Sequence, residues 1–151
     1  MAKSNFVYVT YIKTTPEKLW KALTDPKIIS KYWFGLRIES DLKVGSTWKF
    51  FFGDDLMDSG KILKKAPKKL LVRSWQNEWK PELKKEGISR CTYEIARAGP
   101  SMKLTVTHSM NRANSKFIDA VAAGWPMCIS NLKTLLETGK VALIEHPGHE
   151  D

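Results

Sequence analysis

His108 is the first candidate for chemistry, because the ordinary pKa of histidine lies close to neutral pH. It alternates with Leu104 and Val106, whereas Thr105 and Thr107 occupy the positions between. In a strand, this period of two predicts that His108 faces the core together with the two aliphatic residues. There it could hydrogen-bond a ligand or act as an acid or base. A buried histidine satisfied by its neighbours is the other interpretation, and the sequence leaves both open.

Arg73 poses a similar question, because it lies between Leu71 and Trp75 on the same predicted strand face. If it points inward, it needs a carboxylate partner or an acidic ligand, since an unpaired buried charge is very costly. A register shifted by one residue would instead put Arg73 on the solvent face. The sequence leaves these alternatives open as well.

The sequence shows no recognisable nucleophile, metal or nucleotide motif. Cys91 and Cys128 are isolated, with no CxxC spacing, and Cys128 has no histidine or acid nearby in the sequence, so we expect it to pack in the core. No GxGxxG, P-loop, GxSxG or HExxH pattern occurs. Asp54, Asp55 and Asp58 are typical of a hairpin tip. We therefore predict no catalytic residue, no metal and no cofactor.

The net charge is +9, from 25 Lys and Arg against 16 Asp and Glu, and nearly all of the excess is lysine. The densest basic stretch runs from Lys61 to Arg73, and its Lys-Lys pairs flank Pro67. Paired lysines at turns usually keep sheet edges soluble, whereas base recognition favours arginine. We therefore do not expect a nucleic-acid partner.

Length and composition predict a single globular domain. The chain has 151 residues, 42% of them hydrophobic and 27% charged, which is ordinary for a folded domain. No apolar run is long enough to span a membrane or to resemble a signal peptide. Together with two isolated cysteines, this favours a cytoplasmic protein without a membrane partner.

The hydrophobic pattern predicts an α+β fold. Residues 6–12 are β-branched and aromatic, and two short helices follow, each beginning with a capping residue and a proline (Thr15-Pro16 and Asp25-Pro26). From about residue 37 to 110, apolar residues alternate with polar ones, as in an antiparallel meander, which gives about seven strands in total. A long helix is predicted from about Lys116 to Thr138. We place the domain at residues 1–139 and expect residues 140–151 to form a loosely held tail.

The two ends of the chain resemble the START-like (SRPBCC, helix-grip) superfamily. The opening stretch from Tyr8 to Pro26 and the closing stretch from Gly124 to Gly139 are most similar to the branch typified by the Aha-type activator of the heat-shock chaperone ATPase. Thr105 to His108, and the succession of Pro67, Leu71 and Trp75, match the same branch. The resemblance covers about residues 5 to 139.

The resemblance implies a seven-stranded antiparallel sheet curled around the long C-terminal helix, with a ligand cavity between them. In this superfamily such cavities hold sterols, lipids, plant hormones or polyketides, and some members are enzymes. Six tryptophans in so short a chain are consistent with a cavity walled by rings. The candidate lining residues are Trp33, Trp48, Phe50, Arg73, Trp75, Tyr93, His108, Phe117 and Trp125.

Three functions remain open from the sequence. The first is binding of an apolar or aromatic small molecule in that cavity, with His108, Tyr93 or Arg73 orienting it. The second is a protein-interaction module that contacts a chaperone-like partner through the basic surface. The third is a cyclase-like or hydrolase-like enzyme. Either a monomer or a homodimer fits the sequence, since Trp79 is expected to be exposed.

Overall fold

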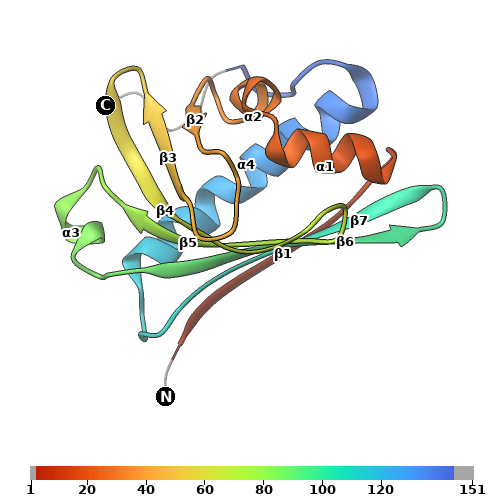
Figure 1. The fold of residues 1–151 in the computed structure, drawn as a ribbon. Helices are drawn as coiled ribbons and strands as arrows, with labels where there is room; N and C mark the ends of the chain where they lie inside the picture. The colour runs from red at the N-terminus through yellow and green to blue at the C-terminus, as the bar shows by residue number, and fades with distance from the viewer. Residues whose placement is uncertain (1–2, 145–151) are drawn as a thin grey trace.

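The computed structural model describes residues 3–144. Seven strands form one antiparallel sheet in the order β1-β7-β6-β5-β4-β3-β2, and the helices α1, α2 and α4 lie on one side of it (Figure 1). This arrangement confirms the predicted α+β helix-grip fold. The elements are β1 (Ser4–Ile12), α1 (Pro16–Thr24), α2 (Pro26–Tyr32), β2 (Arg37–Glu39), β3 (Thr47–Phe52), β4 (Asp55–Ala66), β5 (Leu70–Asn77), α3 (Pro81–Lys84), β6 (Ser89–Ala98), β7 (Ser101–Met110) and α4 (Lys116–Thr138).

The helices begin where the capping residues predict. The Thr15 hydroxyl accepts a hydrogen bond from the Lys18 amide, and the Asp25 carboxylate accepts one from Lys27. α4 begins at the Ser115 cap and ends at Gly139, whose φ of 87° is left-handed. The short helix α3 lies in a segment where the sequence predicted only a turn.

The register of the sheet decides which side chains meet α4. Arg73 pairs with Cys91 on β6, and Cys91 pairs with His108 on β7. All three side chains are buried and therefore point to the helix side, whereas neighbours such as Arg90 point to the outer face. The alternative register with Arg73 in solvent is not the one observed.

Two polar connections hold α4 against the sheet. At its N-terminus, the Glu86 carboxylate accepts hydrogen bonds from the Ser115 hydroxyl and from the amides of Lys116 and Phe117. Toward its C-terminus, Lys133 Nζ donates to the Tyr11 carbonyl at 2.7 Å, and Glu137 accepts from the Lys13 amide at 2.8 Å. The helix is therefore fixed at both ends across the same sheet face.

Part of the predicted tail is held by the core. The buried Asn131 side chain accepts from the Leu143 amide at 2.7 Å and donates to the Leu143 carbonyl at 2.9 Å. The remainder, residues 145–151, lies outside the described residues, and the domain boundary at residue 139 stays a prediction. Within residues 3–144, no helix is both long enough and apolar enough to cross a bilayer.

Candidate functional site

The side chains predicted to line a cavity come together between the sheet and α4. They come from four strands, one helix and one helix end: Trp48 and Phe50 from β3, Arg73 and Trp75 from β5, Tyr93 from β6, His108 from β7, Phe117 and Trp125 from α4, and Trp33 from the residue after α2. All except Trp33 are less than 5% exposed. We refer to Trp33, Trp48, Phe50, Trp75, Tyr93, His108, Phe117 and Trp125 as the ring cluster.

The rings of this cluster touch one another. Centroid separations run from 4.8 Å between Trp48 and Trp75 to 6.2 Å between Trp33 and Trp75, and many of the pairs meet edge to face. Edge-to-face pairs at these distances are favourable beyond the area that they bury. The space in which the sequence suggested a cavity is thus occupied by contacting side chains.

Arg73 lies among these rings. Its guanidinium carbon is 4.7 Å from the ring centroid of Trp48 and 4.6 Å from that of Trp75. Its Nη2 donates to the Tyr93 hydroxyl at 3.1 Å, whereas its Nε is buried and has no hydrogen-bond partner. Within residues 3–144, no carboxylate oxygen lies within 4 Å of this guanidinium. A buried charge is therefore held by aromatic faces, the Tyr93 hydroxyl and the Cys91 sulfur, without an ion pair.

Asp58 is the acid of this region that the sequence assigned to a hairpin tip. Its Oδ1 accepts a hydrogen bond from Trp75 Nε1 at 2.9 Å. Burial raises the pKa of its carboxyl to about 6, although the Trp75 hydrogen bond and the charge of Arg73 both act in the opposite direction. Trp75 thus lies between a buried cation and a carboxyl that titrates near neutral pH.

His108 has both ring nitrogens occupied. Trp125 Nε1 can only donate, so Nδ1 accepts its hydrogen bond at 3.1 Å. The proton of the neutral ring is then on Nε2, which donates to Ser89 Oγ at 2.8 Å, and Ser89 donates onward to the Trp75 carbonyl. Burial, with the charge of Arg73 acting in the same direction, lowers the pKa of His108 to about 3.

This hydrogen-bond direction determines what the Ser89–His108 pair can do. In serine catalysis, histidine takes the proton of the serine hydroxyl, so its nitrogen must accept. Here the nitrogen donates to the hydroxyl, and a histidine with so low a pKa is a poor base near pH 7. The geometry therefore gives His108 a structural role, with no free nitrogen to offer a ligand.

The two thiols are equally inert. Burial raises the pKa of Cys91 to about 11 and that of Cys128 to about 12. Both remain protonated thiols near neutral pH, whereas a nucleophilic cysteine acts as its thiolate.

Trp33 is the one partly buried ring of the cluster. Its centroid is 5.2 Å from those of Phe50 and Trp125. The residue that follows, Phe34, has a φ of 55°, a left-handed conformation that is strained for an aromatic residue. The cluster thus reaches the surface at a side chain attached to a strained turn.

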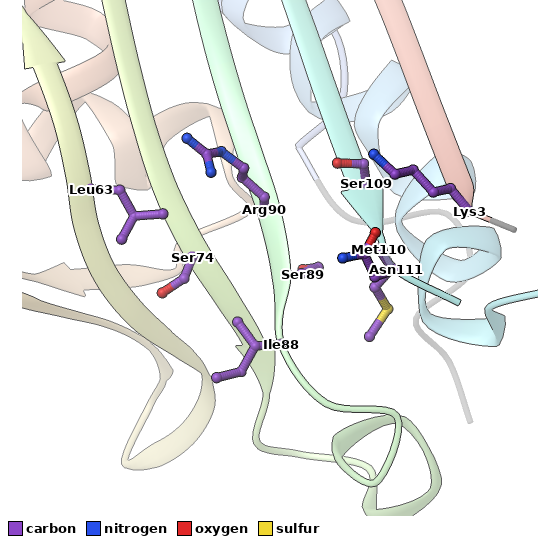
Figure 2. A pocket seen from close by; sticks show the side chains of 9 residues that line it. All are labelled: Lys3, Leu63, Ser74, Ile88, Ser89, Arg90, Ser109, Met110 and Asn111. Carbon is purple, nitrogen blue, oxygen red and sulfur yellow. The ribbon is translucent and has the colours of Figure 1, made fainter. Parts of the chain in front are cut away.

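Two hollows lie elsewhere, on the opposite face of the sheet. The first, of about 380 Å³, lies over β4 to β7 and the start of β1, where Arg90, Ser74 and Ser109 face away from α4 (Figure 2). The second, of about 400 Å³, includes Lys69, Glu94 and Lys103. Neither is lined by a residue of the ring cluster.

Sequence reasoning missed three residues of this region. Asp58 lies close to two other aspartates that are typical of a hairpin tip, and only the observed register, which pairs it with Phe50, places it beside the core. Ser89 is the first residue of β6, and nothing in the sequence singled it out. Gly60 carried no signal, because only the approach of Trp48 to the Ser74 carbonyl shows why a side chain is excluded there.

Comparison with known proteins identifies relatives over nearly the whole chain. The sequence profile of the family described as "Activator of Hsp90 ATPase homolog 1-like protein" matches residues 13–137. The solution structure of the Aha1 dimer from Colwellia psychrerythraea is 27% identical, with a TM-score of 0.74 over 91% of this chain and 98% of that chain. A search of curated proteins found no match.

Two crystal structures below 25% identity support the fold alone. Protein MLL2253 from Mesorhizobium loti is 24% identical, with a TM-score of 0.76 over 88% of this chain and 96% of its own. PFC0360w, an HSP90 activator from Plasmodium falciparum, is 23% identical, with a TM-score of 0.72 over 87% of this chain and 95% of its own.

Proposed function

Since this chain belongs to the Activator of Hsp90 ATPase homolog 1-like family and has the helix-grip fold, we propose that it binds a small aromatic or apolar molecule within the ring cluster. The observation that carries this proposal is Trp33, a partly buried ring that covers buried rings of β3, β5 and α4. The ligand takes the place of the Trp33 ring when that side chain moves outward. We place this activity in the cytoplasm, where the free thiols Cys91 and Cys128 stay reduced.

Binding by displacement follows from the packing. A ligand ring in place of Trp33 would meet the faces and edges of Phe50, Trp75 and Trp125, which supply apolar area and aromatic contacts. The ligand must also overcome the cost of moving Trp33, and this cost lowers the apparent affinity by the fraction of molecules that are open. The strained Phe34 lessens that cost, because opening the turn releases the strain.

The test uses N-phenyl-1-naphthylamine, a neutral dye that fluoresces in apolar surroundings. We expect Trp33→Ala to bind this dye about tenfold more tightly than the wild type, because removing the indole abolishes the opening cost, about 1.4 kcal/mol for a factor of ten. The matched control is Trp79→Ala, which removes a half-exposed tryptophan outside the cluster and should leave the dye affinity unchanged.

Trp33→Phe keeps a ring in place and serves if the alanine variant does not fold, as monitored by circular dichroism. It should bind the dye with an affinity between those of the wild type and Trp33→Ala. Equal affinities of the folded Trp33 variants and the wild type, or no dye response in any of them, would overturn the proposal.

A protein-interaction role is the second candidate, favoured by the outer face of β1. Val7, Val9 and Tyr11 are 51%, 43% and 53% exposed on this edge strand, more than isolated surface residues require. Among the similar structures, one is an HSP90 activator and another an Aha1 dimer. We propose an acidic chaperone ATPase as the partner, since this chain carries a net charge of +9.

A purified Hsp90-class chaperone from the same organism tests this second candidate. The protein should raise the rate of ATP hydrolysis severalfold at low salt, and the stimulation should fade by about 0.5 M salt as charges are screened. Val9→Ser should weaken the stimulation, whereas Val44→Ser should not, because it changes a valine that is exposed to an even greater extent but lies on the loop before β3. An unchanged hydrolysis rate at saturating protein would contradict this role.

A further inference from the structure

The charge at the centre of the ring cluster determines what kind of molecule fits there. The Arg73 guanidinium is 4% exposed, yet no carboxylate of residues 3–144 forms an ion pair with it. A buried cation normally has both an opposite charge and a full set of hydrogen-bond acceptors. Arg73 has only neutral partners, namely the Tyr93 hydroxyl, the Cys91 sulfur and the surrounding ring faces, and its Nε hydrogen has no acceptor.

Asp58, an acid on which the charge of Arg73 acts, does not fill this gap. Asp58 is oriented toward Trp75, since its Oδ1 accepts the indole hydrogen of that residue. The charge of Arg73 acts on Asp58, but no carboxylate oxygen of Asp58 lies within 4 Å of the guanidinium nitrogens. Moving Asp58 toward Arg73 would break its hydrogen bond to Trp75 and leave a buried donor unsatisfied.

The unpaired cation and Trp33 share two neighbouring rings, those of Phe50 and Trp75. Trp33 and Arg73 both contact the rings of Phe50 and Trp75: Trp33 at centroid separations of 5.2 and 6.2 Å, and the Arg73 guanidinium carbon at 5.5 and 4.6 Å. A molecule that replaces the Trp33 ring therefore enters a layer of rings that also borders the guanidinium. A planar acid group on that molecule would meet a planar set of donors.

We propose that the ligand of the ring cluster is an aromatic carboxylic acid, whose carboxylate pairs with Arg73 while its ring replaces that of Trp33. This inference rests on the proposed small-molecule binding and specifies the chemical class of the ligand. Arg73 selects the acid, because a neutral analogue leaves the buried cation without its counter-charge. The aromatic part supplies the apolar contacts.

Two isosteric probes test the charge directly: 2-naphthoate, which is an anion, and 2-naphthamide, which is neutral. Each is titrated against the protein loaded with N-phenyl-1-naphthylamine, and the binding of each alone is followed by isothermal titration calorimetry. We expect 2-naphthoate to bind the wild type at least about tenfold more tightly than 2-naphthamide, as is typical of hydrogen bonds to a charged group.

Arg73→Met removes the charge and keeps an unbranched, flexible side chain, although a shorter one. It should bind both probes equally and still bind the neutral dye. The matched control is Arg90→Met, the same change at an exposed arginine of β6 that points to the other face of the sheet, and it should keep the preference. Arg73→Lys retains the positive charge but lacks the planar guanidinium that can donate two parallel hydrogen bonds to a carboxylate. It should keep part of the preference for 2-naphthoate, and it serves as the test if the methionine variant fails to fold.

The outcomes separate the two proposals. If the wild type binds the neutral dye but binds 2-naphthoate and 2-naphthamide equally, the acid inference is wrong and the small-molecule proposal survives. If folded Arg73→Met keeps the preference, the acid group is recognised elsewhere and the inference is equally wrong. If neither the dye nor either probe binds, both proposals are wrong.

Discussion

Replacing Gly60 with alanine is expected to lower the free energy of unfolding by about 3–5 kcal/mol, a large share of the total for a small domain. Gly60 pairs with Trp48 in the sheet. The Trp48 indole crosses it and donates from Nε1 to the Ser74 carbonyl at 2.9 Å. A Cβ at residue 60 would overlap that carbonyl oxygen and lie 2.8 Å from Trp48 Nε1. The local strand pairing would therefore be distorted, and the hydrogen bond from Trp48 Nε1 to the Ser74 carbonyl would be broken.

Urea denaturation of the variant and the wild type provides the measurement, and Gly124→Ala is the matched control. Gly124 lies inside α4, and an added Cβ there would meet no atom within 4 Å. This variant should gain about 0.5–1 kcal/mol, the usual difference between alanine and glycine in a helix. If Gly60→Ala were as stable as the wild type, the Trp48 indole could be accommodated beside a residue with a Cβ atom, and the prediction would be wrong.

Acidification from pH 6.5 to pH 3 is expected to destabilise the protein through His108 by about 5 kcal/mol. The unfolded-state pKa is 6.5, and the folded-state pKa is lowered to about 3; each pKa unit corresponds to about 1.4 kcal/mol. Within this window the unfolded chain takes up a proton that the folded His108 does not, so stability falls as the pH falls.

Asp58 opposes this loss over part of the range. Its pKa rises from 3.8 in the unfolded state to about 6 in the folded state, so the folded state takes up the extra proton. Its contribution therefore adds about 3 kcal/mol of stability as the pH falls from 6 to 4, and this gain is lost again as the pH rises through 6. The two buried groups nearly compensate each other between pH 6 and 4.

Asp58→Asn separates the two contributions, because asparagine keeps an acceptor for Trp75 Nε1 without a titrating carboxyl. We expect it to be more stable than the wild type at pH 7 and to lose stability steeply between pH 6.5 and 4, where the wild type changes little. His108→Gln, which can still accept from Trp125 and donate to Ser89, should lessen the acid loss. Parallel stability curves for the wild type and Asp58→Asn in urea denaturation at successive pH values would contradict this account.

Much of the candidate site follows from periodicity alone. The alternation of Leu71, Arg73 and Trp75 placed these side chains on one face, and the pattern around His108 did the same for β7; the structure shows all four buried. Local hydrophobic pattern is informative here because a strand has only two faces and one of them packs against α4. The N-caps of α1 and α2 could be predicted for a similar reason, since each depends on residues within one helical turn.

The sequence could not predict hydrogen-bond partners that lie on other strands or helices. The direction of the His108 hydrogen bonds depends on Trp125, which is 17 residues away, and on Ser89, which is 19 residues away. Asp58 looked like part of a turn until Trp75 was found to donate to it. These contacts join segments that only the register of the sheet and the position of α4 bring together.

By itself, the amino-acid sequence determined the family, the seven-stranded helix-grip fold and the aromatic residues that gather between the sheet and α4. Only the tertiary structure decided that the rings contact one another, that His108 is a neutral donor, and that Arg73 is buried without a carboxylate. The physical reason is that alternation and capping act between near neighbours in the chain, whereas packing density and the sharing of a buried charge depend on distances between separate elements.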